Sequence, residues 1–396
     1  MRAATALALG VILGLAPAAA RANEAFLDSE AIEATEVAGP LAADPAAELW
    51  NRLPAGTLVA VPQRTIRLND RAANAALAQA APRTLAVRAA FDGKDLAVAV
   101  DWSDSTEDRA RLDETDAFGD GAALELPLHF GAGVRLPYVG MGDEGMPVVL
   151  YRALASADGT NGWAGAASGF GSLTRADPGG ARVAMHYDRR RKAWRAVFVR
   201  PLAAGAHDLR QGLVPFALAV WDGARHERGG NKALTRWKFL RLPRYPLDSA
   251  YVGELSYGYA TGGLGDLARG KVLVETVCAA CHAVGDRRIA PPGIAPDLTA
   301  IGGIATPGYL RDSLLDPSAV IVPNPNPDQH YDRSKPPGAA GAFPRNDSFV
   351  WYRRDPGGKK ISKMPAFGSL PKADLAAMVA YMMTLGAPSP GDRRQP

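Results

Sequence analysis

The sequence predicts two domains, an N-terminal all-β sandwich followed by a C-terminal all-α domain. Apolar residues alternate with a period of two from about residue 81 to residue 242, which is typical of strands. Prolines and glycines then interrupt the pattern, and beyond them apolar residues recur three and four positions apart, as in helices. The length of 396 residues also fits two or three domains, at about 150 residues each.

The composition narrows the class of protein. Hydrophobic residues make up 47% of the chain and charged residues 22%, so the chain can bury cores and is not disordered as a whole. The 42 glycines and 31 prolines exceed the average share, which favours many turns and short strands over a helical bundle. A net charge of +4 is too small and too scattered to indicate nucleic-acid binding. Two cysteines exclude a disulfide-rich scaffold.

Residues 1–22 are predicted to be a cleavable signal peptide. Met1 and Arg2 precede an apolar run, and the run ends in Ala20-Arg21-Ala22, which matches an A-x-A cleavage site. An uncleaved membrane anchor is the alternative, but the run is short, rich in alanine and ends in small residues, which favours cleavage. No later stretch reaches the ~18 apolar residues that a membrane span needs. We therefore expect export to a bacterial periplasm, with no membrane span after cleavage.

The β-sandwich is expected over residues 45–245, where turn signals separate short alternating stretches. The clearest hairpin joins residues 85–91 to residues 96–102 through Asp92-Gly93. The other alternating stretches are residues 183–187, 194–198, 216–220 and 237–239. Many short strands joined by turns of glycine, aspartate and proline predict a sandwich.

A linker is expected over residues 246–262, and a helical domain over residues 263–390. The linker region is rich in glycine and tyrosine and lacks a clear period. One helix is predicted just before the two cysteines, and another that opens at Pro371 and closes at Gly386. Between the two helices lies a proline- and asparagine-rich loop, at about residues 323–344, and a loop of that length is usually functional or partly disordered.

The most specific motif is Cys278-Ala279-Ala280-Cys281-His282. Two thiols three positions apart can bond to both vinyl groups of a haem, and the adjacent histidine then lies under the iron as its ligand. Thioredoxin-like redox pairs share the cysteine spacing, but they need a βαβ context and leave the histidine unexplained. A zinc site would need two more ligands at matching spacing, and the chain has no other cysteine. The motif therefore predicts one covalently bound haem c, attached to Cys278 and Cys281, with His282 as an iron ligand.

Together with this motif, the segments around it make residues 262–386 resemble a class I cytochrome c. Those segments are Ala295-Pro296-Asp297-Leu298, Tyr309-Leu310, Asp316-Pro317 and Lys363-Met364-Pro365-Ala366-Phe367-Gly368. The resemblance implies that Met364 is the second axial ligand, and a thioether raises the redox potential by favouring Fe(II). A core methionine is the alternative for Met364. Its separation from His282, 82 residues, is long for this family, and the intervening loop offers His330 as a rival ligand.

A series of spaced motifs within about residues 50–245 resembles the haem b-binding gamma subunits of the type II DMSO reductase family, the ethylbenzene dehydrogenase-like group. The motifs lie at residues 102–106, 116–122, 138–143, 194–202 and 219–237. The resemblance implies that Met141 and Lys232 ligate a non-covalent haem b. A lysine binds iron only as the neutral amine, and a lysine in a Gly-Gly-Asn-Lys loop is by default a solvated turn residue. Met146 is a rival to Met141, and His226 is a rival to Lys232.

The two resemblances imply a periplasmic electron-transfer subunit with two haems, b in the sandwich and c in the C-terminal domain. Its partners would be a molybdopterin catalytic subunit, an iron–sulfur subunit and a soluble electron carrier. The combination is also similar to the small subunit of exported nitrite oxidoreductases, and the substrate of the catalytic subunit stays open. With both irons six-coordinate, the chain itself would carry out no bond chemistry.

Two other functions stay open from the sequence. The first is a cytochrome c fused to a haem-free sandwich that binds carbohydrate or a protein surface, for which exposed tryptophans would be the sign. The second is a small-molecule oxidase or dehydrogenase that acts at haem c alone. The number of haems per chain distinguishes the haem-free binding module from the dihaem electron-transfer subunit. Ligand exchange at the iron of haem c tests the oxidase or dehydrogenase.

Overall fold

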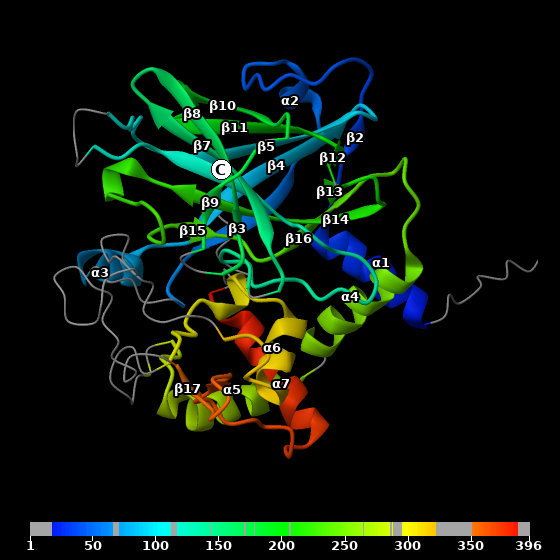
Figure 1. Cartoon of the computed structure of the whole chain (residues 1–396), viewed down its shortest axis with the longest axis vertical. Helices are drawn as coiled ribbons and strands as arrows, with labels where there is room; N and C mark the ends of the chain where they lie inside the picture. The colour runs from blue at the N-terminus through cyan, green and yellow to red at the C-terminus, as the bar shows by residue number, and fades with distance from the viewer. Residues whose placement is uncertain are drawn as a thin grey trace, which may run out of the picture.

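The structure, a computed structural model, has a β-rich part and a helical part (Figure 1), which confirms the predicted fold class. It describes residues 18–65, 71–111, 117–143, 145–169, 172–177, 179–205, 207–263, 265–285, 287, 295–321 and 351–386. Most of the predicted signal peptide and the loop that contains His330 lie outside the described residues. Within those ranges, no helix is long and apolar enough to cross a membrane.

The β-rich part is a sheet that folds back on itself to form a sandwich. Its strands, in the order in which they pair, are β10 (Arg182–Asp188), β11 (Ala193–Pro201), β5 (Asp95–Ser103), β4 (Arg83–Phe91), β3 (Gly56–Pro62), β15 (Ala233–Leu234), β14 (Leu213–Trp221), β6 (Gly121–Pro127), β7 (Val148–Ser156), β8 (Gly159–Ala167) and β9 (Thr174–Arg175). Off this path, β16 (Lys238–Arg241) pairs with β14 and with β1 (Ala31–Glu33), and β2 (Thr35–Glu36) pairs with β4. Strand β10 also contacts β7 and β8, so the two ends of the path meet around a common core.

Two hairpins form where the sequence predicts them. The β4–β5 turn contains Gly93 with φ of +88°. The carboxylate of Asp92 accepts the N–H groups of Lys94 and Asp95 at 2.8 and 2.7 Å, which fixes this turn. The carboxylate of Asp188 accepts backbone N–H groups in the same way at the β10–β11 turn.

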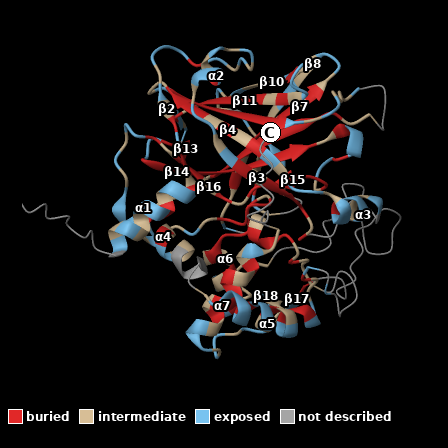
Figure 2. Ribbon diagram, turned by 180° about the vertical axis from the view of Figure 1, so that it is seen from behind, coloured by how far each residue is buried: buried red, intermediate tan, exposed pale blue. Residues whose placement is uncertain are grey.

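Alternation along the strands gives the sheet two different faces. On β6, the side chains of Ala122, Leu124 and Leu126 point into the core between the layers. Ala123 and Glu125 therefore point the other way, toward the face that the helical part partly covers. Figure 2 shows these strands as largely buried, in keeping with a sheet covered on both faces. This second face is where the candidate haem b ligands lie.

The helical part consists mainly of α4 (Ser249–Gly263), α5 (Leu267–Val277), α6 (Pro307–Leu315) and α7 (Lys372–Thr384), with a hairpin of β17 (Tyr352–Arg354) and β18 (Lys360–Ser362). Helix α5 begins at Asp266, whose carboxylate accepts an N–H group of the first turn at 3.0 Å. Helix α7 begins after Pro371 and ends before Gly386, which has φ of +78°. These two helices agree with the predicted ones.

The segment interpreted as a linker, residues 246–262, is mostly the helix α4. Its Tyr251 and Val252 are buried with Phe26 of α1 (Ala18–Glu30) and Phe239 of β16. Glycines within α4 and the exposed Tyr257 obscure the helical period in the sequence. Since α4 also contacts α6 and α7, it joins the sheet to the helical part. The two remaining short helices are α2 (Leu49–Arg52) and α3 (Arg71–Gln79).

A single turn of 3-10 helix, η3 (Ile301–Gly303), packs the helical part directly onto the sheet. A Cβ atom added to Gly303 would lie 2.5 Å from Val61 Cγ1 of β3, so the contact requires glycine. Arg236 donates a hydrogen bond to the carbonyl of Gly302 at 3.2 Å. Ile304 is buried in the same cluster as Val61. The helical part is therefore seated on the second face of the sheet.

Candidate functional site

A cavity of about 450 Å³ lies in the helical part, beside its boundary with the sheet. The predicted haem c residues Cys278, Cys281, His282 and Met364 all line it. Its apolar walls include Val277, Leu298, Ile301, Leu310, Leu314, Phe367 and Met382. Two residues of the β-rich part, Thr65 and Tyr138, also line it. Cavities of this size and character bind small molecules and cofactors.

The Cys-X-X-Cys-His motif reaches this cavity at the end of α5. The helix continues into η2 (Cys278–Ala280), and the N–H group of His282 donates to the carbonyl of Cys278 at 2.9 Å. The Nδ1 atom of His282 lies 2.7 Å from the carbonyl oxygen of Pro296. Because a carbonyl oxygen can only accept, Nδ1 carries the hydrogen and Nε2 keeps its lone pair for a metal. Burial lowers the pKa of His282, which favours the neutral ring that a metal needs.

The two thiols are not arranged as a reactive redox pair. Cys278 is buried and Cys281 is exposed, and both are free. Burial, together with the neighbouring Cys281, raises the pKa of Cys278 to about 11. Redox-active cysteines have lowered pKa values, so this environment argues against the thioredoxin-like alternative.

Met364 reaches the same cavity from the segment that follows β18. Its N–H group donates to Ser362 Oγ at 3.1 Å, and Pro365 beside it also lines the cavity. Met378 is fully buried in the core of the helical part. Met382 is a further methionine on the cavity wall.

This set of donors fits a covalently attached haem. An imidazole nitrogen and a thioether sulfur are the groups that hold the iron in many c-type sites, and two thiols beside the imidazole match the attachment points. The structure brings all four groups to one apolar cavity. Their assignment as haem attachment points and iron ligands stays a prediction.

Lys232, the predicted haem b ligand, is buried at the start of β15. It is 8% exposed, so the interpretation as a solvated turn residue is wrong. Its Nζ lies 5.4 Å from the ring centre of Trp221. Burial lowers the pKa of Lys232; the carboxylate of Glu125 opposes this shift and the cation of Arg152 adds to it. The environment therefore favours the neutral amine that iron can bind.

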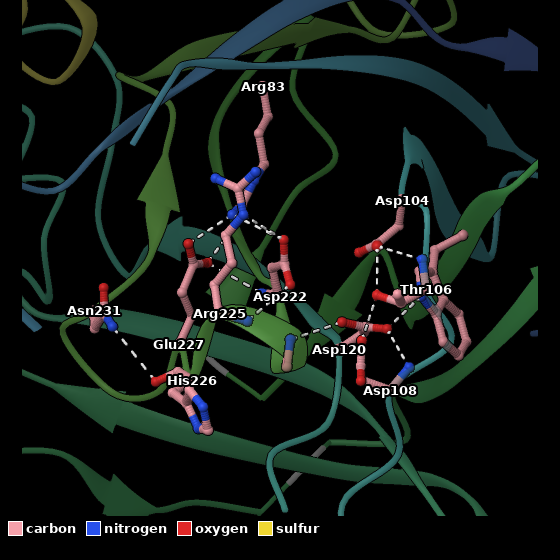
Figure 3. A network of polar contacts seen from close by, with 12 residues as sticks. Arg83, Asp104, Thr106, Asp108, Asp120, Asp222, Arg225, His226, Glu227 and Asn231 are labelled. Carbon is pink, nitrogen blue, oxygen red and sulfur yellow. Dashed lines mark hydrogen bonds and ion pairs between the residues drawn. The ribbon is translucent and has the colours of Figure 1, made fainter. Parts of the chain in front are cut away.

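A polar network holds the loop that leads to Lys232 (Figure 3). Arg83 donates two hydrogen bonds to the carboxylate of Glu227, at 2.7 and 2.6 Å. The same carboxylate accepts the N–H group of Asp222 at 3.0 Å. Asp222 in turn caps the short helix η1 (Gly223–Arg225). These contacts fix the backbone of the loop at Asp222 and Glu227. The position of Lys232, which directly precedes β15, is therefore well defined.

Three carboxylates that the sequence analysis did not single out lie together beside this network, those of Asp104, Asp120 and Asp222, with oxygen atoms within 4.8 Å of one another. Asp120 is fully buried. It accepts hydrogen bonds from Asp108 N–H, Gly223 N–H and the indole of Trp194, each at 2.8 Å. Burial raises the pKa of Asp120 to about 7. Three donors satisfy the carboxylate of Asp120, and through them Asp120 links the ends of neighbouring strands.

Met141 lies in the loop between β6 and β7 and shares a neighbour with Lys232. Burial raises the pKa of Glu125 to about 8, and the nearby backbone N–H group of Met141 opposes this shift. The same carboxylate interacts electrostatically with Lys232. Met141 is half-buried and packs on the second face of the sheet, where the neighbours include the small residues Ala123 and Ala219. The two predicted haem b ligands thus lie near the same carboxylate on one face of the sheet.

The backbone of Met141 is unusual, with φ of +88°. Such values are rare for residues other than glycine and concentrate at functional sites. The rival Met146 is half-buried and pairs through its backbone with Asp143, at 3.0 and 3.2 Å. The rival His226 is exposed, and its ring packs against Phe118 with 5.7 Å between ring centres. A buried amine whose neutral form is favoured and a thioether sulfur on the same face of the sheet are groups that can bind iron, and their assignment as haem b ligands stays a prediction.

Sequence reasoning missed three residues that line or support these sites, namely Thr65, Glu125 and Tyr138. Glu125 carried a signal, because it is the one charged residue in an otherwise apolar strand. Thr65 carried none, and Tyr138 stood out only as part of the motif at residues 138–143, because the position of both residues beside the cysteines depends on how the two parts of the molecule pack.

Comparisons with known proteins agree with both parts of the fold. Residues 267–386 match the cytochrome c family model. The chain is 32% identical over 243 residues to chlorate reductase subunit gamma of Ideonella dechloratans, and the match covers 58% of this chain and 95% of that protein. It is 28% identical over 238 residues to a Haloferax mediterranei protein provisionally named respiratory nitrate reductase heme subunit ORF7, with 59% of this chain and 79% of that protein covered.

Two weaker similarities complete the comparison. Dimethylsulfide dehydrogenase subunit gamma of Rhodovulum sulfidophilum is 31% identical over 166 residues, which covers 40% of this chain and 60% of that protein. A carbohydrate binding module of family 9 from Caldicellulosiruptor kristjanssonii aligns with a TM-score of 0.32 and 10% identity, over 55% of this chain and 98% of that one. A score that low supports no conclusion about function.

Proposed function

The chain belongs to the family of gamma subunits that includes chlorate reductase subunit gamma, and on this premise we propose that it is a dihaem electron-transfer subunit of a molybdenum oxidoreductase. The observation that carries the proposal is the presence of two separate donor sets in one chain. Cys278, His282 and Met364 line one cavity, and Lys232 and Met141 both lie near Glu125 at the sheet face. Haem, when bound, supplies one-electron chemistry at its iron.

The residues of this chain hold and tune such groups rather than act on a substrate. The carbonyl of Pro296 orients the His282 ring through Nδ1, and a thioether from Met364 favours the reduced iron. Burial lowers the pKa of Lys232, which favours the neutral amine. Two protein ligands for each iron leave no open position for a substrate, which suits electron transfer.

The partners follow from the relatives and from the family resemblance. The relatives are named as subunits of a chlorate reductase and of a dimethylsulfide dehydrogenase. We infer a molybdopterin catalytic subunit and an iron–sulfur subunit on one side, and a soluble electron carrier on the other. The signal peptide predicted at residues 1–22 supports a periplasmic location, and a nitrite oxidoreductase-like complex is one form that we propose for this assembly.

A count of haems tests the proposal. Extraction with acidified acetone followed by a pyridine haemochrome assay should release one b-type haem and leave one c-type haem on each chain. Cys278→Ala combined with Cys281→Ala is the matched control, which should lose the retained haem and keep the extractable one. Recovery of c-type haem alone, from protein matured with adequate haem, would instead support the haem-free binding module.

The partners and the location need a separate test. Affinity purification of the native protein from its own cells should bring down a molybdopterin subunit and an iron–sulfur subunit. Fractionation of the same cells should find the protein in the periplasm with its first 22 residues removed. Isolation of the chain without any partner subunit, under conditions that preserve related complexes, would contradict this part of the proposal.

A further inference from the structure

One short loop, residues 135–143, contributes to both proposed haem sites. Tyr138 lines the cavity that holds the Cys-X-X-Cys-His motif. Met141 stands three positions later, on the sheet face beside Glu125. The loop belongs to the β-rich part, so it carries a residue of one domain into the cofactor cavity of the other.

Hydrogen bonds give this loop a defined shape. The N–H group of Tyr138 donates to Asp143 Oδ2 at 2.7 Å, and its carbonyl accepts the N–H group of Gly142 at 2.9 Å. Arg135 pairs with the carboxylate of Asp143, with Nη1 at 2.8 Å. The indole of Trp237 donates to the carbonyl just before Tyr138, at 2.7 Å. The distance between the two sites is therefore set within a single rigid turn.

The ring of Tyr138 lies between the two parts of the molecule. It is 4% exposed, so solvent does not separate it from its neighbours. Its ring centre lies 5.7 Å from that of Tyr309 on α6, with 47° between the ring planes. Trp351 is buried in the same cluster, and Val320 packs against it. Aromatic side chains thus fill the boundary at the wall of the cavity.

We infer that Tyr138 and the turn from Tyr138 to Met141 form the path by which an electron passes between the two haem sites. This inference rests on the proposed function. Electronic coupling decays less steeply through bonds and packed atoms than across a solvent gap. The buried ring of Tyr138 lies three positions before Met141, a predicted haem b ligand, so this stretch of chain is a favourable route for the electron. One electron leaves ferrous iron at one site and reduces ferric iron at the other. No bond forms or breaks, and Tyr138 itself is neither oxidised nor reduced overall.

The test is the rate of electron transfer between the haems in the full-length protein with both haems bound. Rapid photochemical reduction of one haem, followed at the separate absorption bands of the b and c haems, measures this rate directly. Tyr138→Leu should slow the transfer several-fold, whereas Tyr138→Phe should keep it near the wild-type value because the ring remains. Redox potentials and the near-infrared band of haem c are measured for each variant, so that a change in driving force is not mistaken for a change in coupling.

Tyr251→Leu is the matched control, because Tyr251 is also a buried tyrosine but packs with Phe26 and Phe239, in a cluster that contains none of the proposed haem ligands. It should leave both haem spectra and the inter-haem rate unchanged. Tyr138→Met provides a second non-aromatic variant if Tyr138→Leu does not retain its haems. An unchanged rate in the non-aromatic variants, or equal slowing by Tyr251→Leu, would overturn the role of Tyr138. A wild-type protein without haem b would overturn the proposed function itself.

Discussion

Burial distinguishes an iron-ligating lysine from a surface lysine at the residue scale. Lys232→Ala should remove one ligand of haem b, since the buried amine beside Trp221 and Glu125 has no substitute donor in alanine. The ferric haem should become partly high-spin and the ferrous haem should bind carbon monoxide. Optical and electron paramagnetic resonance spectra report both changes. A buried lysine that ligates no iron would instead change the stability of the protein and leave the haem b spectra unaltered.

Lys238→Ala is the matched control for that experiment. Lys238 of β16 is also largely enclosed, and it pairs with Glu30, the last residue of α1, at 2.7 Å. Its loss should lower stability without altering either haem spectrum. If Lys232→Ala leaves haem b unaltered while Met141→Ala disturbs it, another residue such as His226 supplies the second ligand.

Met364 is tested in the same way at the other site. Met364→His should keep haem c attached, because the thioether links and the His282 bond remain, and it should lower the redox potential markedly. The near-infrared methionine–iron band should disappear. Met378→Leu, a change inside the core, should leave both properties unaltered. An unchanged potential in Met364→His would point to Met382, which lines the same cavity.

Individual site residues could be predicted from the sequence where the motif that identifies them is short and contiguous. The spacing of Cys278, Cys281 and His282 is local and was sufficient to predict one cofactor. Met141 and Lys232 came only from a family resemblance. The burial of Lys232 could not be predicted, because it depends on a clamp between Arg83 and Glu227, which are 144 positions apart.

At the scale of elements, a strand pairing could be predicted from the sequence where the residues of the turn between the two strands encode it. The β4–β5 hairpin was predicted because Asp92 and Gly93 encode its turn within a few residues. The pairing of β6 with β14 could not be predicted, because it joins residues that are far apart in the sequence, such as Glu125 and Ala217. Helix α4 was missed because its burial is provided by α1 and β16, which no local pattern reveals.

The carboxylate of Asp120 makes the stability of the sandwich depend on pH. Its pKa is raised from 3.8 in the unfolded chain to about 7 in the folded protein. Between these values the folded protein holds a proton that the unfolded chain has lost, so the free energy of unfolding should fall as pH rises. Denaturant unfolding followed by tryptophan fluorescence measures this slope.

Asp120→Asn should flatten that part of the pH dependence and lower stability at every pH, by about 1–3 kcal/mol, because at least one of the three N–H donors loses its acceptor. The signature is therefore a weaker slope and not only a lower midpoint. A variant that keeps the full slope would show that another group, such as Glu125, causes it.

For the whole molecule, the two domains share a cavity wall and a packed boundary. Thr65 and Tyr138 complete the cavity of the helical part, and Gly303 packs against Val61 of the sheet. We therefore expect the holoprotein to unfold as one cooperative unit. Tryptophan fluorescence, which reports mainly on the sandwich, and the near-infrared band of haem c should be lost at the same denaturant concentration.

Gly303→Leu tests whether this contact is the cause of the coupling. A side chain at Gly303 has no room beside Val61, so the helical part must move away from the sheet, at a cost of about 1–3 kcal/mol. The two transitions should then separate, with the haem c band lost first because its cavity has lost a wall. Gly308→Leu, at an α6 position with open space around it, is the matched control and should keep the transitions together. Separate transitions already in the wild type would mean that the sandwich and the cytochrome c domain unfold as independent units. The loop of residues 135–143, which contains Tyr138, would then contribute little to holding the two domains together.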